Sequence, residues 1–180
     1  MNIKKLSVNA HLLGEFTLTT PVMRVSDPCY EKDVWCCGVL ENCVEGSWEA
    51  AVYYTHDGYA AGLAVRSAGT SAPSFADLDT ETEDWAYASF EVGVDSGQAG
   101  FYDDTMYQDD SVVEEDPDFS KNCNCSKWFG LCCDKTLSKQ LAGIIPYGVV
   151  SSAGYGDGGY DCEYHTNADG KIDFAWIRFI

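Results

Sequence analysis

Basic residues are scarce in this sequence of 180 residues. Eleven lysines and arginines stand against 29 aspartates and glutamates, which leaves a formal net charge of −18. Binding to nucleic acid or to an anionic membrane surface would bring like charges together, so both partners are disfavoured. The charge instead favours a protein partner with a basic surface.

Long apolar runs and an export signal are also lacking. A membrane-spanning helix needs a stretch of about 18 apolar residues, and none occurs. The opening residues, MNIKKLSVNAHLLGEF, contain neither a long apolar segment nor a small-residue cleavage site. We therefore expect a soluble, cytoplasmic protein.

Cysteine is too sparse for a small disulfide scaffold, since a chain of 180 residues holds only nine. The number is also odd, so the cysteines cannot all pair within one chain. Reduced thiols buried as small apolar side chains are expected. Zinc is a minority interpretation for four thiols close in sequence, because two of them are adjacent and would diverge by about 100° on a helix. Those four are Cys123, Cys125, Cys132 and Cys133. An earlier set, Cys29, Cys36, Cys37 and Cys43, is favoured less.

No complete catalytic motif is present: the chain has no G-x-S-x-G, P-loop, H-E-x-x-H or kinase signature. The G-x-G-x-x-G match at Gly154–Gly159 is followed by too little chain for a second strand and helix, so a turn is expected. Residues 165–170 resemble the start of a calcium loop but lack its first carboxylate and its final glutamate. These absences favour a protein that is not an enzyme.

Short runs of alternating apolar and polar residues, rich in β-branched and aromatic side chains, predict strands. Glycine-containing turns separate several of them, as at 44–47, 56–58 and 167–170. One helix is expected at roughly 128–142, where apolar residues recur every three or four positions and Gly143 follows. The strands are expected at 16–20, 22–26, 48–55, 59–67, 87–94, 148–152, 160–166 and 171–180.

The predicted fold is therefore mostly β: an antiparallel β-sandwich or partly closed barrel with one short α-helix. The chain has the length of one domain, 1–180. Two runs, 77–84 and 103–118, hold 13 of the 29 acids and are expected to form solvated loops. Free sheet edges leave a homodimer open.

Several segments together carry a family resemblance. They are VSDPCY at 25–30 with WC at 35–36, VDSGQAGFYD at 94–103, WFGLCCDKTL at 128–137, and SSAGYGDGGYDC at 151–162. In these the chain resembles a family of small proteins of unknown function found in tailed phages and bacteria, over about residue 22 to the end. The resemblance implies a phage or mobile-element accessory protein, which would act in the cytosol of the host cell, and it implies no reaction.

The same segments predict a candidate polar pocket. Glycines at 97, 100 and 154–159 allow another backbone or a ligand to approach closely. If the acidic and amide side chains converge, they suit a cation such as calcium or a small polar molecule, with tyrosines as walls. The alternative is that the carboxylates cap tight turns at one end of the sandwich. The candidate residues are Asp27, Tyr30, Asp95, Ser96, Gln98, Asp103, Tyr155, Asp157 and Tyr160.

Three functions follow as hypotheses. The first is a non-catalytic binding protein that modulates or inhibits a host factor, such as a defence protein, including by acidic imitation of nucleic acid. The second is a module that binds a small polar ligand or a cation through the two glycine-rich segments. The third is an enzyme that uses a cysteine or carboxylate in the same pocket.

Overall fold

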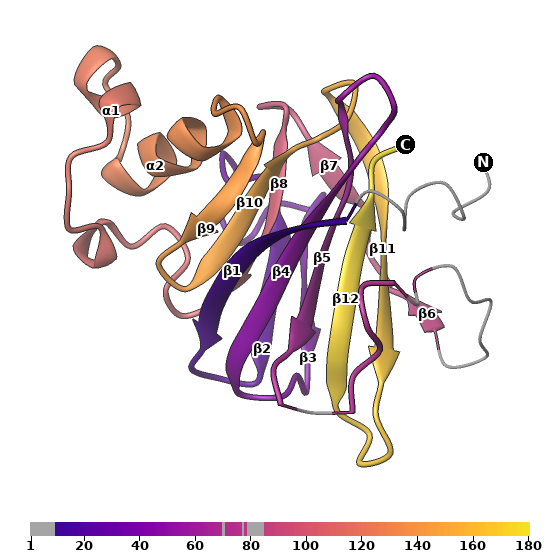
Figure 1. The fold of residues 1–180 in the computed structure, drawn as a ribbon. Helices are drawn as coiled ribbons and strands as arrows, with labels where there is room; N and C mark the ends of the chain where they lie inside the picture. Colours follow the sequence, from indigo (N-terminus) through magenta and orange to yellow (C-terminus); the bar gives the residue numbers. More distant parts are fainter. Residues whose placement is uncertain (1–9, 70, 77, 79–84) are drawn as a thin grey trace.

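The computed structural model describes residues 10–69, 71–76, 78 and 85–180, and shows two antiparallel sheets packed face to face (Figure 1). The large sheet has the order β1-β4-β5-β12-β11-β6, and β7 pairs with the start of β11. Its strands are β1 (Ala10–Leu18), β4 (Gly46–Tyr54), β5 (Ala60–Ser67), β6 (Trp85–Tyr87), β7 (Val92–Val94), β11 (Gly158–Thr166) and β12 (Ile172–Arg178). The small sheet has the order β3-β2-β8-β10-β9, from β2 (Val22–Ser26), β3 (Gly38–Glu41), β8 (Gln98–Asp103), β9 (Ala142–Ile145) and β10 (Gly148–Ser152).

The main core lies between the two sheets. Alternate residues of each strand point inward, so Trp48, Phe101 and Ile177 are buried among aliphatic side chains of both sheets. Neither sheet closes on itself among the described strands. The sandwich form of the predicted fold is therefore confirmed, and the partly closed barrel is not observed.

Both sheets are also covered on parts of their outer faces. On the large sheet, Phe75 and Leu78 from the connection after β5 pack against Phe174 and Trp176. On the small sheet, Trp128 and Cys132 from a helix pack against Tyr102, with a tyrosine from the loop after β8. This extra burial explains why β8 is buried at every position.

The helices between β8 and β9 are η4 (Asp110–Val112), α1 (Asp118–Asn122) and α2 (Lys127–Thr136), and the figure shows α1 and α2 on one side of the molecule, beside β9 and β10 (Figure 1). Ser126 caps α2, since its hydroxyl accepts a hydrogen bond from the Phe129 N–H at 3.2 Å. Gly130 lets α1 lie against α2: a Cβ there would lie 1.8 Å from the Ser120 Oγ. No helix in the described part of the chain is long and apolar enough to cross a membrane.

Several expectations are corrected in detail. The helix predicted at 128–142 ends at Thr136, and residues 137–141 form turns that lead into β9. The strand predicted at 87–94 is two short strands, β6 and β7, and β3, β8 and β9 were not predicted. The acidic run at 103–118 is a connection that contains η4, whereas the run at 77–84 lies outside the described residues apart from Leu78.

Candidate functional site

Asp27 is the central residue of the predicted pocket, and it is completely buried. One carboxylate oxygen accepts hydrogen bonds from the Cys29 N–H (2.8 Å) and the Ser96 hydroxyl (2.6 Å). The other accepts from the backbone N–H groups of Asp95 (2.8 Å) and Ser96 (2.7 Å). These four donors satisfy the buried charge and join two segments almost 70 residues apart in sequence. Asp27 thus caps turns.

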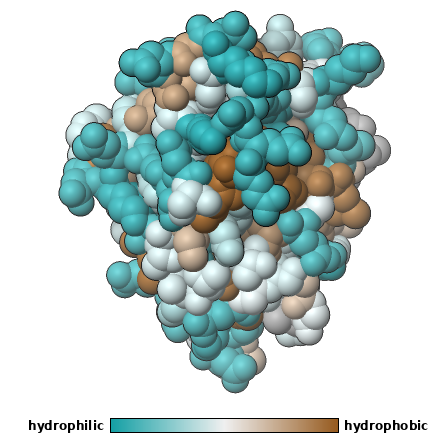
Figure 2. Space-filling model, turned by 90° about the vertical axis from the view of Figure 1, so that its left-hand side faces the viewer, coloured by the Kyte–Doolittle hydropathy of each residue, from teal (hydrophilic) through white to brown (hydrophobic). Residues whose placement is uncertain are grey.

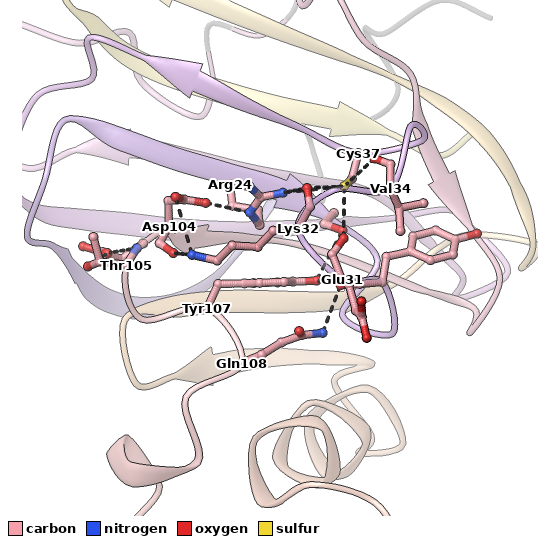
Figure 3. A network of polar contacts seen from close by, with 12 residues as sticks. Arg24, Glu31, Lys32, Val34, Cys37, Asp104, Thr105, Tyr107 and Gln108 are labelled. Carbon is pink, nitrogen blue, oxygen red and sulfur yellow. Dashed lines mark hydrogen bonds and ion pairs between the residues drawn. The ribbon is translucent and has the colours of Figure 1, made fainter.

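A polar network holds the loop that follows Asp27 against the turn after β8 (Figure 3). Buried Arg24 forms an ion pair with Asp104 at 2.7 Å and donates to the Lys32 carbonyl. The Tyr107 hydroxyl donates to the Tyr30 carbonyl at 2.7 Å, and the Gln108 amide also reaches that carbonyl, at 2.9 Å. The loop is therefore fixed by its backbone carbonyls.

The pKa values of Cys29 and Tyr30 are raised above their ordinary values. Partial burial of the thiol, together with a hydrogen bond to Asp27 and charge repulsion from it, raises the pKa of Cys29 to about 12, although the residue as a whole is exposed. Burial and hydrogen bonds to Cys36 and Asp95 raise the pKa of the Tyr30 hydroxyl. Both groups are protonated at neutral pH, so Cys29 is a poor nucleophile here.

The turn between β7 and β8 brings Ser96 and Gln98 to the edge of a cavity. Gly97 adopts a left-handed conformation there (φ 71°). The Gln98 side chain, 5% exposed, donates to the Ser96 hydroxyl and to the Cys133 sulfur, and accepts from the Thr136 hydroxyl at 3.1 Å. We call this cavity the turn pocket; its volume is about 350 Å³, and its lining is Ser96, Gly97, Gln98, Phe119, Phe129, Cys133, Thr136, Leu137 and Ser152.

The second glycine-rich segment lies beside this turn but outside the pocket. The Ala153 N–H donates to the Gly97 carbonyl, and Gly158 pairs with Val94. Tyr160 turns back to its own segment, where its hydroxyl donates to the Gly156 carbonyl at 2.5 Å. Asp157 is exposed, and Tyr155 is 76% exposed and contacts Tyr59 edge-on. Asp157, Tyr155 and Tyr160 do not line the turn pocket.

Asp103 lies at the opposite end of β8 from Gln98. Its carboxylate accepts hydrogen bonds from the backbone and hydroxyl of Thr19 and of Thr105. The structure thus brings together Asp27, Tyr30, Asp95, Ser96 and Gln98, but a convergence of Asp95, Gln98, Asp103 and Asp157 is not formed. Gly100 serves a close backbone approach, because a Cβ there would lie 2.3 Å from the Val149 carbonyl oxygen.

Two of the four candidate zinc cysteines form a disulfide, Cys123–Cys125, between α1 and α2, which corrects the expectation of reduced thiols throughout. Cys132 and Cys133 are buried on α2. No group of three or more histidine, cysteine, aspartate or glutamate side chains in the described residues is arranged to hold a metal ion. A four-thiolate site would require the disulfide to be reduced.

A further hollow was not predicted. We call it the acidic groove; it has a volume of about 630 Å³ and lies between β1, β9, α2 and the loop that carries η4. Its lining is Glu15, Phe16, Thr17, Val112, Val113, Glu114, Glu115, Leu131, Lys135, Ile144, Ile145, Pro146 and Tyr147. The sequence signal that could have found it is the Val112–Val113 pair inside the acidic run 103–118, since apolar residues are unusual in a solvated loop.

The acidic groove lies where the free edges of both sheets meet. β1 is the last strand of the large sheet and β9 the last strand of the small one. They touch near Gly14, where a Cβ would lie 3.3 Å from Ile144. The face that carries α1, α2 and β9 shows hydrophobic residues gathered near its centre and hydrophilic residues around them (Figure 2).

The acidic groove and the turn pocket both lie on the helical side of this β-sandwich protein. Comparison with known proteins assigns it no relative: no family model, no curated protein and no solved structure matches the chain.

Proposed function

We propose that this is a non-catalytic binding protein whose acidic groove takes a basic, partly apolar segment of a partner protein. The observation that carries the proposal is the composition of the groove. Three glutamates and one lysine stand among apolar side chains from two sheet edges and a helix. An apolar hollow bordered by polar and charged side chains is a form that protein-binding sites commonly take.

The charge of the groove indicates the chemistry of the partner. Glu15, Glu114 and Glu115 outnumber Lys135, and the whole chain carries a formal charge of −18. Arginine or lysine side chains of a partner would meet the glutamates, while its aliphatic side chains would cover the partly exposed Val112 and Leu131. A host factor with a basic surface, such as a defence protein that binds nucleic acid, has this chemistry, and a phage or mobile-element origin would supply that host.

The test is a binding titration with two labelled peptides of equal charge, one alternating lysine with leucine and one alternating lysine with serine. Fluorescence anisotropy gives the dissociation constant of each. We expect the leucine peptide to bind about tenfold more tightly, because only it covers the apolar part of the groove. Equal affinity for the two peptides would mean that the net charge alone attracts them.

A charge-matched pair of double variants locates the binding. Glu114→Gln/Glu115→Gln removes two charges from the groove, and Glu41→Gln/Glu45→Gln removes two exposed charges elsewhere. We expect the first pair to weaken the leucine peptide about tenfold and the second to change it about twofold or less. The same loss in both variants would refute the groove as the site.

A further inference from the structure

The turn pocket is a second concave site, separate from the acidic groove in every lining residue. It lies between the β7–β8 turn, the end of β10 and the two helices, and its volume of about 350 Å³ is within the range of small-molecule sites. A site of this size holds a single small molecule rather than a protein segment.

The helices supply the apolar walls of the turn pocket. Phe119 of α1 and Phe129 of α2 face each other edge to face, with ring centroids 6.5 Å apart. Leu137, 72% exposed, stands beside them. Aromatic side chains bind planar rings favourably through stacked or edge-on contact, so this part of the pocket suits a flat ring.

The remaining lining is polar and uncharged, and it retains hydrogen-bonding capacity. The Gln98 carboxamide oxygen accepts one hydrogen bond, from Thr136, although such an oxygen can accept two. Its amide nitrogen makes only long contacts, 3.3 Å to the Ser96 oxygen and 3.5 Å to the Cys133 sulfur. The side-chain hydroxyl of Ser152 forms no hydrogen bond with any residue that the structure describes. A ligand edge with both a donor and an acceptor would satisfy these groups.

Charge around the turn pocket disfavours an anionic ligand. None of its lining residues is charged, so no lysine or arginine there would neutralise a phosphate or carboxylate. The buried carboxylate of Asp27 lies directly behind Ser96, from whose hydroxyl it accepts a hydrogen bond at 2.6 Å. A negative group in the pocket would be repelled by that carboxylate and would lose its hydration.

We propose that the turn pocket binds an uncharged planar ring with an amide-type edge, the chemistry shared by nucleobases and nicotinamide. The ring lies against Phe119 and Phe129, and its edge exchanges hydrogen bonds with Gln98 and Ser152. The site functions independently of the acidic groove, so failure of the peptide experiment leaves it untouched.

The test is a titration of the ¹⁵N-labelled protein with adenosine, uridine and nicotinamide in turn. We expect saturable shifts of the Gly97 and Ser152 amide signals with at least one probe, at concentrations of about 1 mM or below. The probe that binds distinguishes a nucleobase from nicotinamide. No saturable shift with any of the three at about 10 mM overturns the proposal.

Variants assign the binding to the turn pocket. Ser152→Ala, which removes one hydroxyl, is expected to weaken binding about fivefold, and Phe129→Ala about tenfold. Tyr87→Ala, at a 63% exposed aromatic outside the pocket, is the control and leaves affinity unchanged. If Phe129→Ala unfolds by circular dichroism, Leu137→Asp at the exposed wall replaces it. Undiminished binding in the pocket variants overturns the assignment.

A charged analogue tests the ligand class. Adenosine 5′-monophosphate carries the ring of adenosine and a phosphate, and we expect it to bind at least about tenfold more weakly than adenosine. Tighter binding of the monophosphate would show that the pocket selects anions and would refute an uncharged ligand.

Discussion

At the residue scale, the buried polar side chains differ in whether the fold gives them hydrogen-bond partners. Asp27 accepts four hydrogen bonds and Asp103 accepts four, so each carboxylate stabilises a turn. The sequence indicated a role in a turn for Asp27, because aspartate before proline is typical of turns. It could not indicate the partners of this carboxylate, since Asp27 and Ser96 meet only when β2 and β8 pair.

Two buried tyrosines that touch each other differ in whether their hydroxyls are satisfied. The rings of Tyr102 and Tyr107 lie 5.2 Å apart. The Tyr102 hydroxyl is buried with no hydrogen-bond partner in the described structure, whereas the Tyr107 hydroxyl contacts Ser26, Asp27 and Tyr30. A buried hydroxyl without a hydrogen-bond partner lowers the free energy of unfolding, whereas a hydrogen-bonded one raises it.

We therefore expect opposite results from the same chemical change. Tyr107→Phe should lower the free energy of unfolding by about 1–2 kcal/mol, and Tyr102→Phe should leave it unchanged or raise it by about 1 kcal/mol. Urea unfolding followed by circular dichroism measures both. A larger loss in Tyr102→Phe than in Tyr107→Phe would contradict the assigned hydrogen bonds.

At the element scale, the strands that the sequence predicted well are those with one face in the core and alternating character. β2 and β10 match their predicted bounds, and β4, β5 and β12 are displaced by only one or two residues. β8 was missed because α2 and its own sheet bury all six of its residues, which removes the alternation. β3 and β9 have four residues each, too few for a period to be visible.

For the candidate sites too, only features that lie within one segment could be predicted from the sequence. Local glycine patterns correctly indicated turns, as the positive φ angles of Gly97, Gly154 and Gly156 show. The acidic groove joins side chains of β1, β9, α2 and the η4 loop, so no single segment carries its pattern. A periodicity argument within one segment cannot detect such a site.

Asp103 links the end of β1 to the turn after β8, and this link should make stability depend on pH. Burial raises the pKa of this carboxyl, but hydrogen bonds from Thr105 and Thr19 outweigh burial and hold the pKa below its usual 3.8. Because the folded-state pKa is depressed, the stabilisation is present above about pH 4 and is lost as the pH falls through the lower folded-state value.

Urea unfolding at pH 7, 5 and 3 tests this link. We expect the free energy of unfolding to fall between pH 5 and pH 3, and to fall less in Asp103→Asn, whose side chain does not titrate. The variant itself should be less stable at pH 7, because asparagine has one accepting oxygen where the Asp103 carboxylate has two. An identical decrease in the two proteins would assign the acid sensitivity to other carboxylates.

At the scale of the whole molecule, the charge of −18 acts on folding and on binding in opposite directions. Repulsion among excess carboxylates destabilises the folded chain, and the same field attracts a basic partner. Added salt screens both effects, because the Debye length falls to about 10 Å at 0.1 M. Stability should therefore rise and affinity should fall over the same range of salt concentration.

We expect the free energy of unfolding to increase by about 1 kcal/mol between about 20 and 200 mM NaCl, while the lysine–leucine peptide loses about tenfold in affinity. Glu41→Gln/Glu45→Gln reduces the net charge away from the groove, so its stability should respond less to salt, whereas its peptide affinity should respond as in the parent protein. Glu114→Gln/Glu115→Gln has the same net charge but fewer groove carboxylates, so only this variant should also lose the salt dependence of binding. If the two variants respond alike in binding, the total charge and not the groove selects the partner.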